Sequence, residues 1–141
     1  MMAGRFLDTN VLLRYLTRDD DGKARLALAL LTRVERGEEK VVTSPLVIFE
    51  TVFTLQKRYG FPKEQVRDAV SDLISLRGLE LPNKSLYVRA LELFASENIP
   101  FTDAHAIAYM QSQGLTEIYS WDTDFDHIPG IKRVEPKETI G

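Results

Sequence analysis

The sequence predicts a single α/β domain spanning residues 1–141, with a mainly parallel sheet covered by helices on both faces. Two observations lead to this prediction. Short apolar runs alternate with longer segments in which apolar residues recur at helical spacing, and no tight two-residue hairpin joins consecutive runs. A chain of 141 residues is also long enough to bury a substantial core without a second domain.

The predicted strands are short apolar runs bounded by polar or turn-forming residues. In chain order they are residues 6–7, 40–43, 79–81, 116–120 and 132–134. The first two of these runs are predicted to be buried strands.

The predicted helices lie between these strands and carry apolar stripes at positions i, i+3 and i+4. In chain order they are a helix beginning after residue 10, residues 23–35, residues 45 to about 59, a helix between residues 61 and 78, and residues 84–96 and 102–113. Ser44 and Pro45 form an N-cap and a first-turn proline for the third of these helices. Glycines end several helices, at Gly37, Gly60 and Gly114.

Composition excludes some classes of protein. The chain has no cysteine, which excludes disulfides, a thiolate nucleophile and a cysteine-ligated zinc site. It has no apolar window long enough to cross a membrane, so we expect a soluble cytoplasmic protein. The net charge of −3 does not exclude a nucleic-acid partner, because several carboxylates gathered at one metal site would account for it.

Two acidic residues in the first half of the chain are candidate site residues. Asp8 follows the first strand and precedes a helix, where open α/β sheets place ligand sites, although capping of the helix is the alternative. Glu50 lies between Leu46 and Phe53 on one helical face, so the periodicity predicts a glutamate within an apolar stripe. A buried glutamate needs a partner or a metal ion; the alternative is a stripe-edge residue that reaches solvent or pairs with Arg14.

Two further acidic positions lie in the second half. Asp103 is in the first turn of a predicted helix, where the helix dipole alone could explain an acidic residue. Asp122 follows the fourth predicted strand and begins the alternating acidic series Asp122, Asp124 and Asp126. A solvated acidic loop is the alternative, and the glycine and closing glutamate of an EF-hand loop are missing. His105 falls elsewhere on its helix, and we expect it to be structural.

Four segments that contain these acids resemble the sequence motifs of PIN domains, and within them the VapC-like toxin ribonucleases of VapBC-type toxin–antitoxin pairs. The segments are FLDTNVL at residues 6–12, SPLVIFE at residues 44–50, TDAHAIA at residues 102–108 and SWDTDF at residues 120–125. They occur in the family's order and span almost the whole chain. Ser120 replaces the threonine that the family often has there, and Trp121 is bulkier than the family pattern suggests.

The resemblance implies a metal-dependent endoribonuclease. The family's four acidic positions fall on Asp8, Glu50, Asp103 and Asp122, which would be the catalytic and metal-binding residues. Their oxygen ligands would select Mg²⁺ or Mn²⁺. Thr9 and Ser120 would support the carboxylates by hydrogen bonds, and Asp124 and Asp126 are second-tier candidates for metal ligation or support. Arg14 and Arg18 are candidate RNA contacts. The resemblance also implies an RNA substrate, a small inhibitory antitoxin, a homodimer and no membrane association.

Two other functions remain open from the sequence. A haloacid-dehalogenase-like phosphatase also begins with an aspartate after its first strand, but it needs a second aspartate two residues later, where this chain has Asn10. A PIN-like module that binds RNA or a protein without cutting would be expected to have lost site acids, and all four are present.

Overall fold

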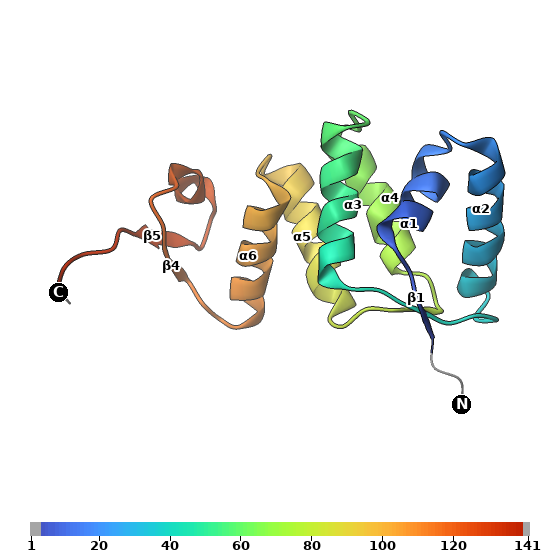
Figure 1. Cartoon of the computed structure of the whole chain (residues 1–141). Helices are drawn as coiled ribbons and strands as arrows, with labels where there is room; N and C mark the ends of the chain where they lie inside the picture. The colour runs from blue at the N-terminus through green and yellow to red at the C-terminus, as the bar shows by residue number, and fades with distance from the viewer. Residues whose placement is uncertain (1–3, 140–141) are drawn as a thin grey trace.

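The structure is a computed structural model of the chain, and it describes residues 4–139. Six α-helices, five short strands and one 3-10 helix alternate along the chain (Figure 1). In order they are β1 (Arg5–Phe6), α1 (Thr9–Thr17), α2 (Asp21–Glu35), β2 (Val41–Val42), α3 (Pro45–Lys57), α4 (Lys63–Ile74), β3 (Leu79–Glu80), α5 (Lys84–Ser96), α6 (Phe101–Ser112), β4 (Glu117–Tyr119), η1 (Thr123–His127) and β5 (Lys132–Val134). Every predicted element is present, with ends that differ by a few residues.

Local sequence explains where several helices begin. The hydroxyl of Ser44 accepts a hydrogen bond from the Val47 amide at 3.4 Å, and Pro45 occupies the first turn of α3. The carboxylate of Asp20 accepts one from the Lys23 amide at 3.0 Å at the start of α2. These N-cap hydrogen bonds therefore determine where α2 and α3 begin.

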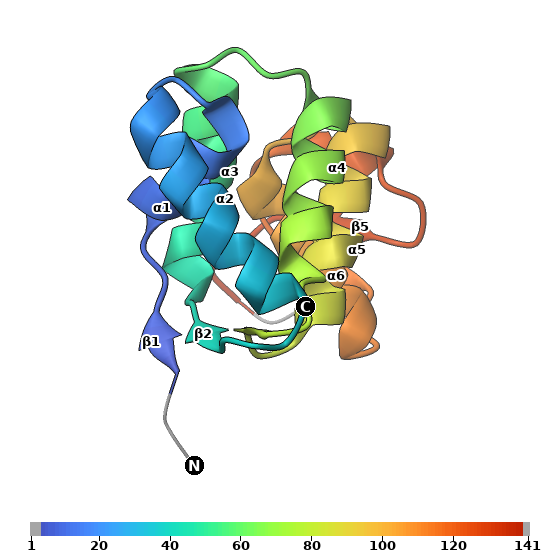
Figure 2. The same ribbon diagram turned by 90° about the vertical axis from the view of Figure 1, so that its right-hand side faces the viewer.

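The strands pair in parallel throughout, as the sequence predicts, but they form two separate sheets. One sheet has the order β1-β2-β3, and the other contains β4 and β5. The two sheets lie toward opposite ends of the molecule with helices between them in Figure 1, and β5 lies behind the helices in the view of Figure 2. The reason is the path of the chain after α6, because β4 runs up the side of α6 that faces away from β1.

The hydrophobic core lies among the helices and the three-stranded sheet. Its largest fully buried side chains come from all six α-helices and β3, and include Phe94, Leu12, Ile48, Leu55, Ile74, Leu91 and Ile107. The chain after α6 contributes little to this core, since its deeply buried apolar side chains are Phe125 in η1 and Ile128 just after it. Among residues 4–139, no helix is long and apolar enough to span a bilayer.

Candidate metal centre

Three carboxylates meet between α6 and the loop that follows β4. Asp103 lies in the first turn of α6, Asp122 caps η1, and Asp124 lies in the first turn of η1. Each offers an oxygen within 4.8 Å of an oxygen of the other two. The structure thus brings together Asp103 and Asp122, two of the four predicted acids, with Asp124, which the sequence suggested as a second-tier candidate for ligation or support.

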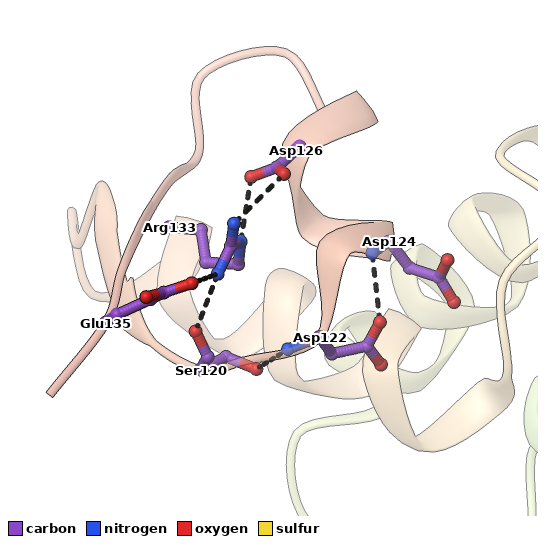
Figure 3. A network of polar contacts seen from close by, with 6 residues as sticks. All are labelled: Ser120, Asp122, Asp124, Asp126, Arg133 and Glu135. Atoms are coloured by element: carbon purple, nitrogen blue, oxygen red, sulfur yellow. Dashed lines mark hydrogen bonds and ion pairs between the residues drawn. The ribbon is translucent and has the colours of Figure 1, made fainter.

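Backbone amides hold the acidic loop in shape. The hydroxyl of Ser120 accepts a hydrogen bond from the Asp122 amide at 2.9 Å. The carboxylate of Asp122 in turn accepts one from the Asp124 amide at 2.9 Å (Figure 3). Ser120 therefore supports the loop through a backbone group and makes no contact with a carboxylate.

Arg133 on β5 fixes the other side of the same loop. Its guanidinium binds both carboxylate oxygens of Asp126, at 2.9 and 3.3 Å, and it also binds Glu135 at 3.0 Å and the Ser120 carbonyl at 3.2 Å (Figure 3). The Arg133 side chain is only 15% exposed. Asp126 is thereby neutralised and turned away from the cluster, which leaves Asp122 and Asp124 as the free acids of the loop. Sequence reasoning did not identify Arg133, because a lone arginine in a short strand carries no local signal.

The electrostatics of the cluster favour a bound cation. Partial burial, and then the neighbouring charges of Asp122 and Asp124, raise the pKa of the Asp103 carboxyl above its usual range. Within residues 4–139, none of these three carboxylates forms an ion pair with a lysine, arginine or histidine. An all-oxygen donor set with uncompensated negative charge fits Mg²⁺ or Mn²⁺.

Asp8 and Glu50 do not belong to this cluster. The buried hydroxyl of Thr9 donates a hydrogen bond to the Glu50 carboxylate at 3.3 Å, which ties the start of α1 to α3. Asp8 is exposed and occupies the N-cap position of α1, but its side chain makes no capping hydrogen bond. Helix capping therefore does not account for Asp8.

The predicted burial of Glu50 is wrong. Its side chain is exposed, and so are Leu46 and Phe53 on the same face of α3, at 79% and 62%. These residues line a groove of about 740 Å³ between α3 and the start of α6, with Phe101 and Thr102 on the opposite wall. The apolar stripe that contains Glu50 thus faces this groove instead of the core.

The remaining residues that the sequence analysis singled out are the two arginines of α1 and a histidine of α6. Arg14 pairs with Asp19 at 2.8 Å instead of with Glu50, whereas Arg18 is exposed at the end of α1. His105 packs against the rings of Phe49 and Tyr87, with centroids 5.1 and 5.5 Å apart, and burial lowers its pKa. This environment fits the structural role expected for His105.

Comparisons with known proteins identify similar chains. A family model described as "PIN domain" matches residues 5–131. A VapC ribonuclease from Aquifex aeolicus is 24% identical over 134 residues, which cover 95% of this chain and 98% of that protein. The crystal structure of Mycobacterium tuberculosis VapC20, described as a sarcin-ricin loop cleaving toxin, is 23% identical, with a TM-score of 0.40 over 87% of this chain and 93% of that one.

Proposed function

The chain belongs to the PIN domain family, and we propose that it is a metal-dependent endoribonuclease that acts as the toxin of a toxin–antitoxin pair. The observation that carries the proposal is the cluster of Asp103, Asp122 and Asp124, since three unpaired carboxylates in one place are costly without a cation. Similarity over almost the full length to a VapC ribonuclease supports RNA as the substrate.

The proposed metal ligands are Asp103, Asp122 and Asp124. Asp8 and Glu50, which lie outside this cluster, are proposed as further acids that act on the RNA. A bound Mg²⁺ or Mn²⁺ would supply an activated water for attack on phosphorus and would neutralise charge on the leaving oxygen. Glu50 would accept a proton or orient water, and the Thr9 hydroxyl would hold its carboxylate in one orientation. Ser120 and Arg133 would position the loop acids without touching the substrate.

RNA would reach the site across the exposed surface around Asp8 and Glu50. Arg18 is the better placed of the two predicted phosphate contacts, since it is exposed, whereas Arg14 is already paired with Asp19. A small protein antitoxin and a cytoplasmic site of action follow from the toxin–antitoxin assignment and belong to the proposal.

The family match and the acidic cluster together argue against the two alternatives. A haloacid-dehalogenase-like phosphatase would use Asp8 as a nucleophile with a second acid at position 10, and Asn10 instead lines a separate groove with Arg14 and Lys23. A module that only binds RNA would not need three converging carboxylates.

Cleavage of purified total RNA by the purified chain tests the proposal. We expect cleavage with Mg²⁺ or Mn²⁺, none with chelator, and at least about a 100-fold lower rate in Asp103→Asn and Asp122→Asn. Asp72→Asn is the matched control, because this exposed carboxylate lies on α4, outside the acidic loop, and it should keep most activity. Cleavage that survives chelator, or that is equal in Asp122→Asn and wild type, would refute the assignment.

A further inference from the structure

Trp121 is the single tryptophan of the chain, and it lies on the acidic loop directly before Asp122. Its side chain is 70% exposed, whereas Phe125 in the same loop is 6% exposed. Tryptophan side chains are highly buried on average, so one that is displayed in this way calls for a reason. The loop thus attaches to the core through Phe125 and presents Trp121 to the solvent.

The backbone on both sides of Trp121 is held by hydrogen bonds. The Ser120 amide donates to the Val134 carbonyl at 3.1 Å, and the Ser120 carbonyl accepts from Arg133 at 3.2 Å. The Asp122 amide donates to the Ser120 hydroxyl at 2.9 Å, which closes a turn across Trp121 (Figure 3). Because only the side-chain torsions of Trp121 remain to be fixed, little conformational entropy is lost when a ligand binds to the ring.

The indole ring of Trp121 is open to a ligand. Within residues 4–139, no aromatic ring stacks on it and no lysine or arginine lies over it. A flat, exposed aromatic ring is the surface on which a nucleobase stacks, and such stacking is a main source of affinity for single-stranded nucleic acids. The ring therefore has the form of a base-binding surface.

The charge of the loop favours a neutral contact with RNA over an ionic one. Asp122 and Asp124 repel a phosphate group until a cation is bound, and Arg133 on the neighbouring strand is only 15% exposed and already paired with Asp126. An exposed lysine or arginine at this place would bind the unpaired carboxylates and compete with the metal ion. Stacking needs no charge, so Trp121 can hold RNA here and leave the carboxylates to the metal.

We propose that Trp121 is a stacking platform for an unpaired nucleobase next to the phosphate that is cut. The inference rests on the proposed function, since Asp122 is a proposed ligand of the metal at that phosphate. The Cα atoms of neighbouring residues are about 3.8 Å apart, so a nucleotide held at Asp122 lies within reach of the ring. The substrate is then RNA that is single-stranded at the cut, because exposing a base from a duplex costs free energy.

The same contact states what is recognised in the RNA. Every base has a π face, so stacking selects for unpaired structure and tolerates different sequences. Trp121 is bulkier than the PIN family pattern suggests at this position, so the platform is a feature of this chain. A protein surface that covers the ring, from a second copy or another partner, is the competing occupant.

Intrinsic fluorescence tests the contact directly, because Trp121 is the only tryptophan. The purified chain is titrated with a short dye-labelled oligouridylate in Ca²⁺, which binds to all-oxygen sites, and anisotropy of the dye reports binding in parallel. We expect saturable quenching of the tryptophan with the same midpoint as the anisotropy, and little quenching by the same strand paired with oligoadenylate.

The possible results of this titration separate the two proposals. Binding or cleavage of RNA without a change in tryptophan emission, or equal quenching by the duplex, would overturn the platform and leave the proposed function standing. No binding and no cleavage would overturn both. A shift of the emission to shorter wavelength when the protein is concentrated without RNA would show that a second copy covers the ring, and would also overturn the platform.

The double variant Trp121→Phe/Tyr109→Trp is the matched control, because it moves the only tryptophan to α6. Tyr109 is 50% exposed, so the relocated probe stays accessible to solvent but leaves the acidic loop. This variant should bind the oligouridylate with unchanged tryptophan emission. Quenching equal to that of wild type would show that the signal does not come from position 121, and would overturn the assignment.

Cleavage kinetics then separate a binding contact from a structural one. Trp121→Ala should raise KM for unpaired RNA about 10-fold and change kcat little, because stacking holds the substrate and the transition state alike. The dependence of affinity on salt concentration should keep its slope, since no phosphate contact is lost. Trp121→Phe keeps a ring and should recover most of the affinity. If wild type and Trp121→Ala cut the RNA with equal KM, the platform is refuted.

Discussion

Thr9 and Glu50 are 41 residues apart in sequence, and the hydrogen bond between their side chains is 3.3 Å long. Thr9 is 3% exposed, so its hydroxyl is held by the packing around the start of α1. Glu50 is exposed and has no positive partner within the described part of the chain. The buried residue therefore restrains the exposed one, and this restraint can be removed without touching a carboxylate.

Replacing Thr9 with valine should weaken activity with little effect on the fold. Valine keeps the buried shape but loses the hydroxyl, so Glu50 becomes free to rotate, at a cost of about 1 kcal/mol for the hydrogen bond. We expect about a 10-fold loss in cleavage rate at limiting Mg²⁺, measured by metal titration. Thr9→Ser keeps the hydroxyl and should retain wild-type behaviour. A wild-type metal titration in Thr9→Val would show that the restraint has no role.

Removing one acid of the cluster should stabilise the protein in chelator. Partial burial and the neighbouring charges of Asp122 and Asp124 raise the pKa of Asp103, so its ionised form is disfavoured in the folded state. Asp103→Asn removes this buried charge and its repulsion from the two neighbours. We expect an increase of about 0.5 kcal/mol in the free energy of unfolding, or about 2 °C in Tm. Added Mg²⁺ should raise the Tm of wild type but not of the variant.

The control for this measurement is Asp126→Asn, which breaks the contact with Arg133 and should not raise the Tm. A lower Tm for Asp103→Asn in chelator would mean that the carboxylate stabilises α6 through the helix dipole.

The acid stability of the α1–α3 contact should depend on Tyr59. The Tyr59 hydroxyl donates to Asp19 at 2.7 Å, and together with Arg14 it lowers the pKa of Asp19 from 3.8 to about 2. Because the folded pKa lies below the unfolded value, this contribution is complete above about pH 4 and is lost as the pH falls toward 2.

We therefore expect Tyr59→Phe to raise the pKa of Asp19 toward its ordinary value in an NMR titration, and to destabilise the protein more at pH 7 than at pH 2. Tyr109→Phe, at an exposed tyrosine of α6, is the control and should change neither quantity. An unchanged Asp19 titration in Tyr59→Phe would contradict the hydrogen bond.

A methyl group at Gly78 should be strongly destabilising. A Cβ there would collide with the Glu39 carbonyl oxygen and lie 2.7 Å from that of Val34, both of which are backbone atoms. We expect Gly78→Ala to cost about 3 kcal/mol in urea unfolding. Gly60→Ala meets no atom within 4 Å and has only the strain of φ = +67°, so about 1 kcal/mol is expected. Equal losses would show that the backbone near Val34 can move aside.

Local signals in the sequence were sufficient for the elements but not for their arrangement. Caps such as Ser44 and breaks such as Gly60 act within one turn, and the helices begin and end near them. The partition into two sheets depends on which side of α6 the chain follows after Gly114, and nothing in the apolar pattern of β4 encodes that choice. Strand pairing is a long-range property, so it was only partly predictable.

The candidate site was also only partly predictable from the sequence. Asp103 and Asp122 were predicted to converge and do so, because each lies at the end of an element that opens onto one place. Glu50 was misplaced because periodicity groups it with Leu46 and Phe53, and it cannot tell an apolar face in a groove from one in the core. Asp126 could be separated from Asp124 only through Arg133, which is seven residues away on another element.

The position of Arg133 in the sequence affects the order in which parts of the protein form during synthesis. Arg133 follows the helices and the acidic loop in sequence, and the loop that carries Asp122 and Asp124 takes its fixed shape only when that guanidinium is in place. Chains fold from the N-terminus as they leave the ribosome, at about 5–20 residues per second. The helical body can therefore assemble while the acidic loop is still unformed, and a nascent chain beside ribosomal RNA carries no finished centre until β5 has left the ribosome.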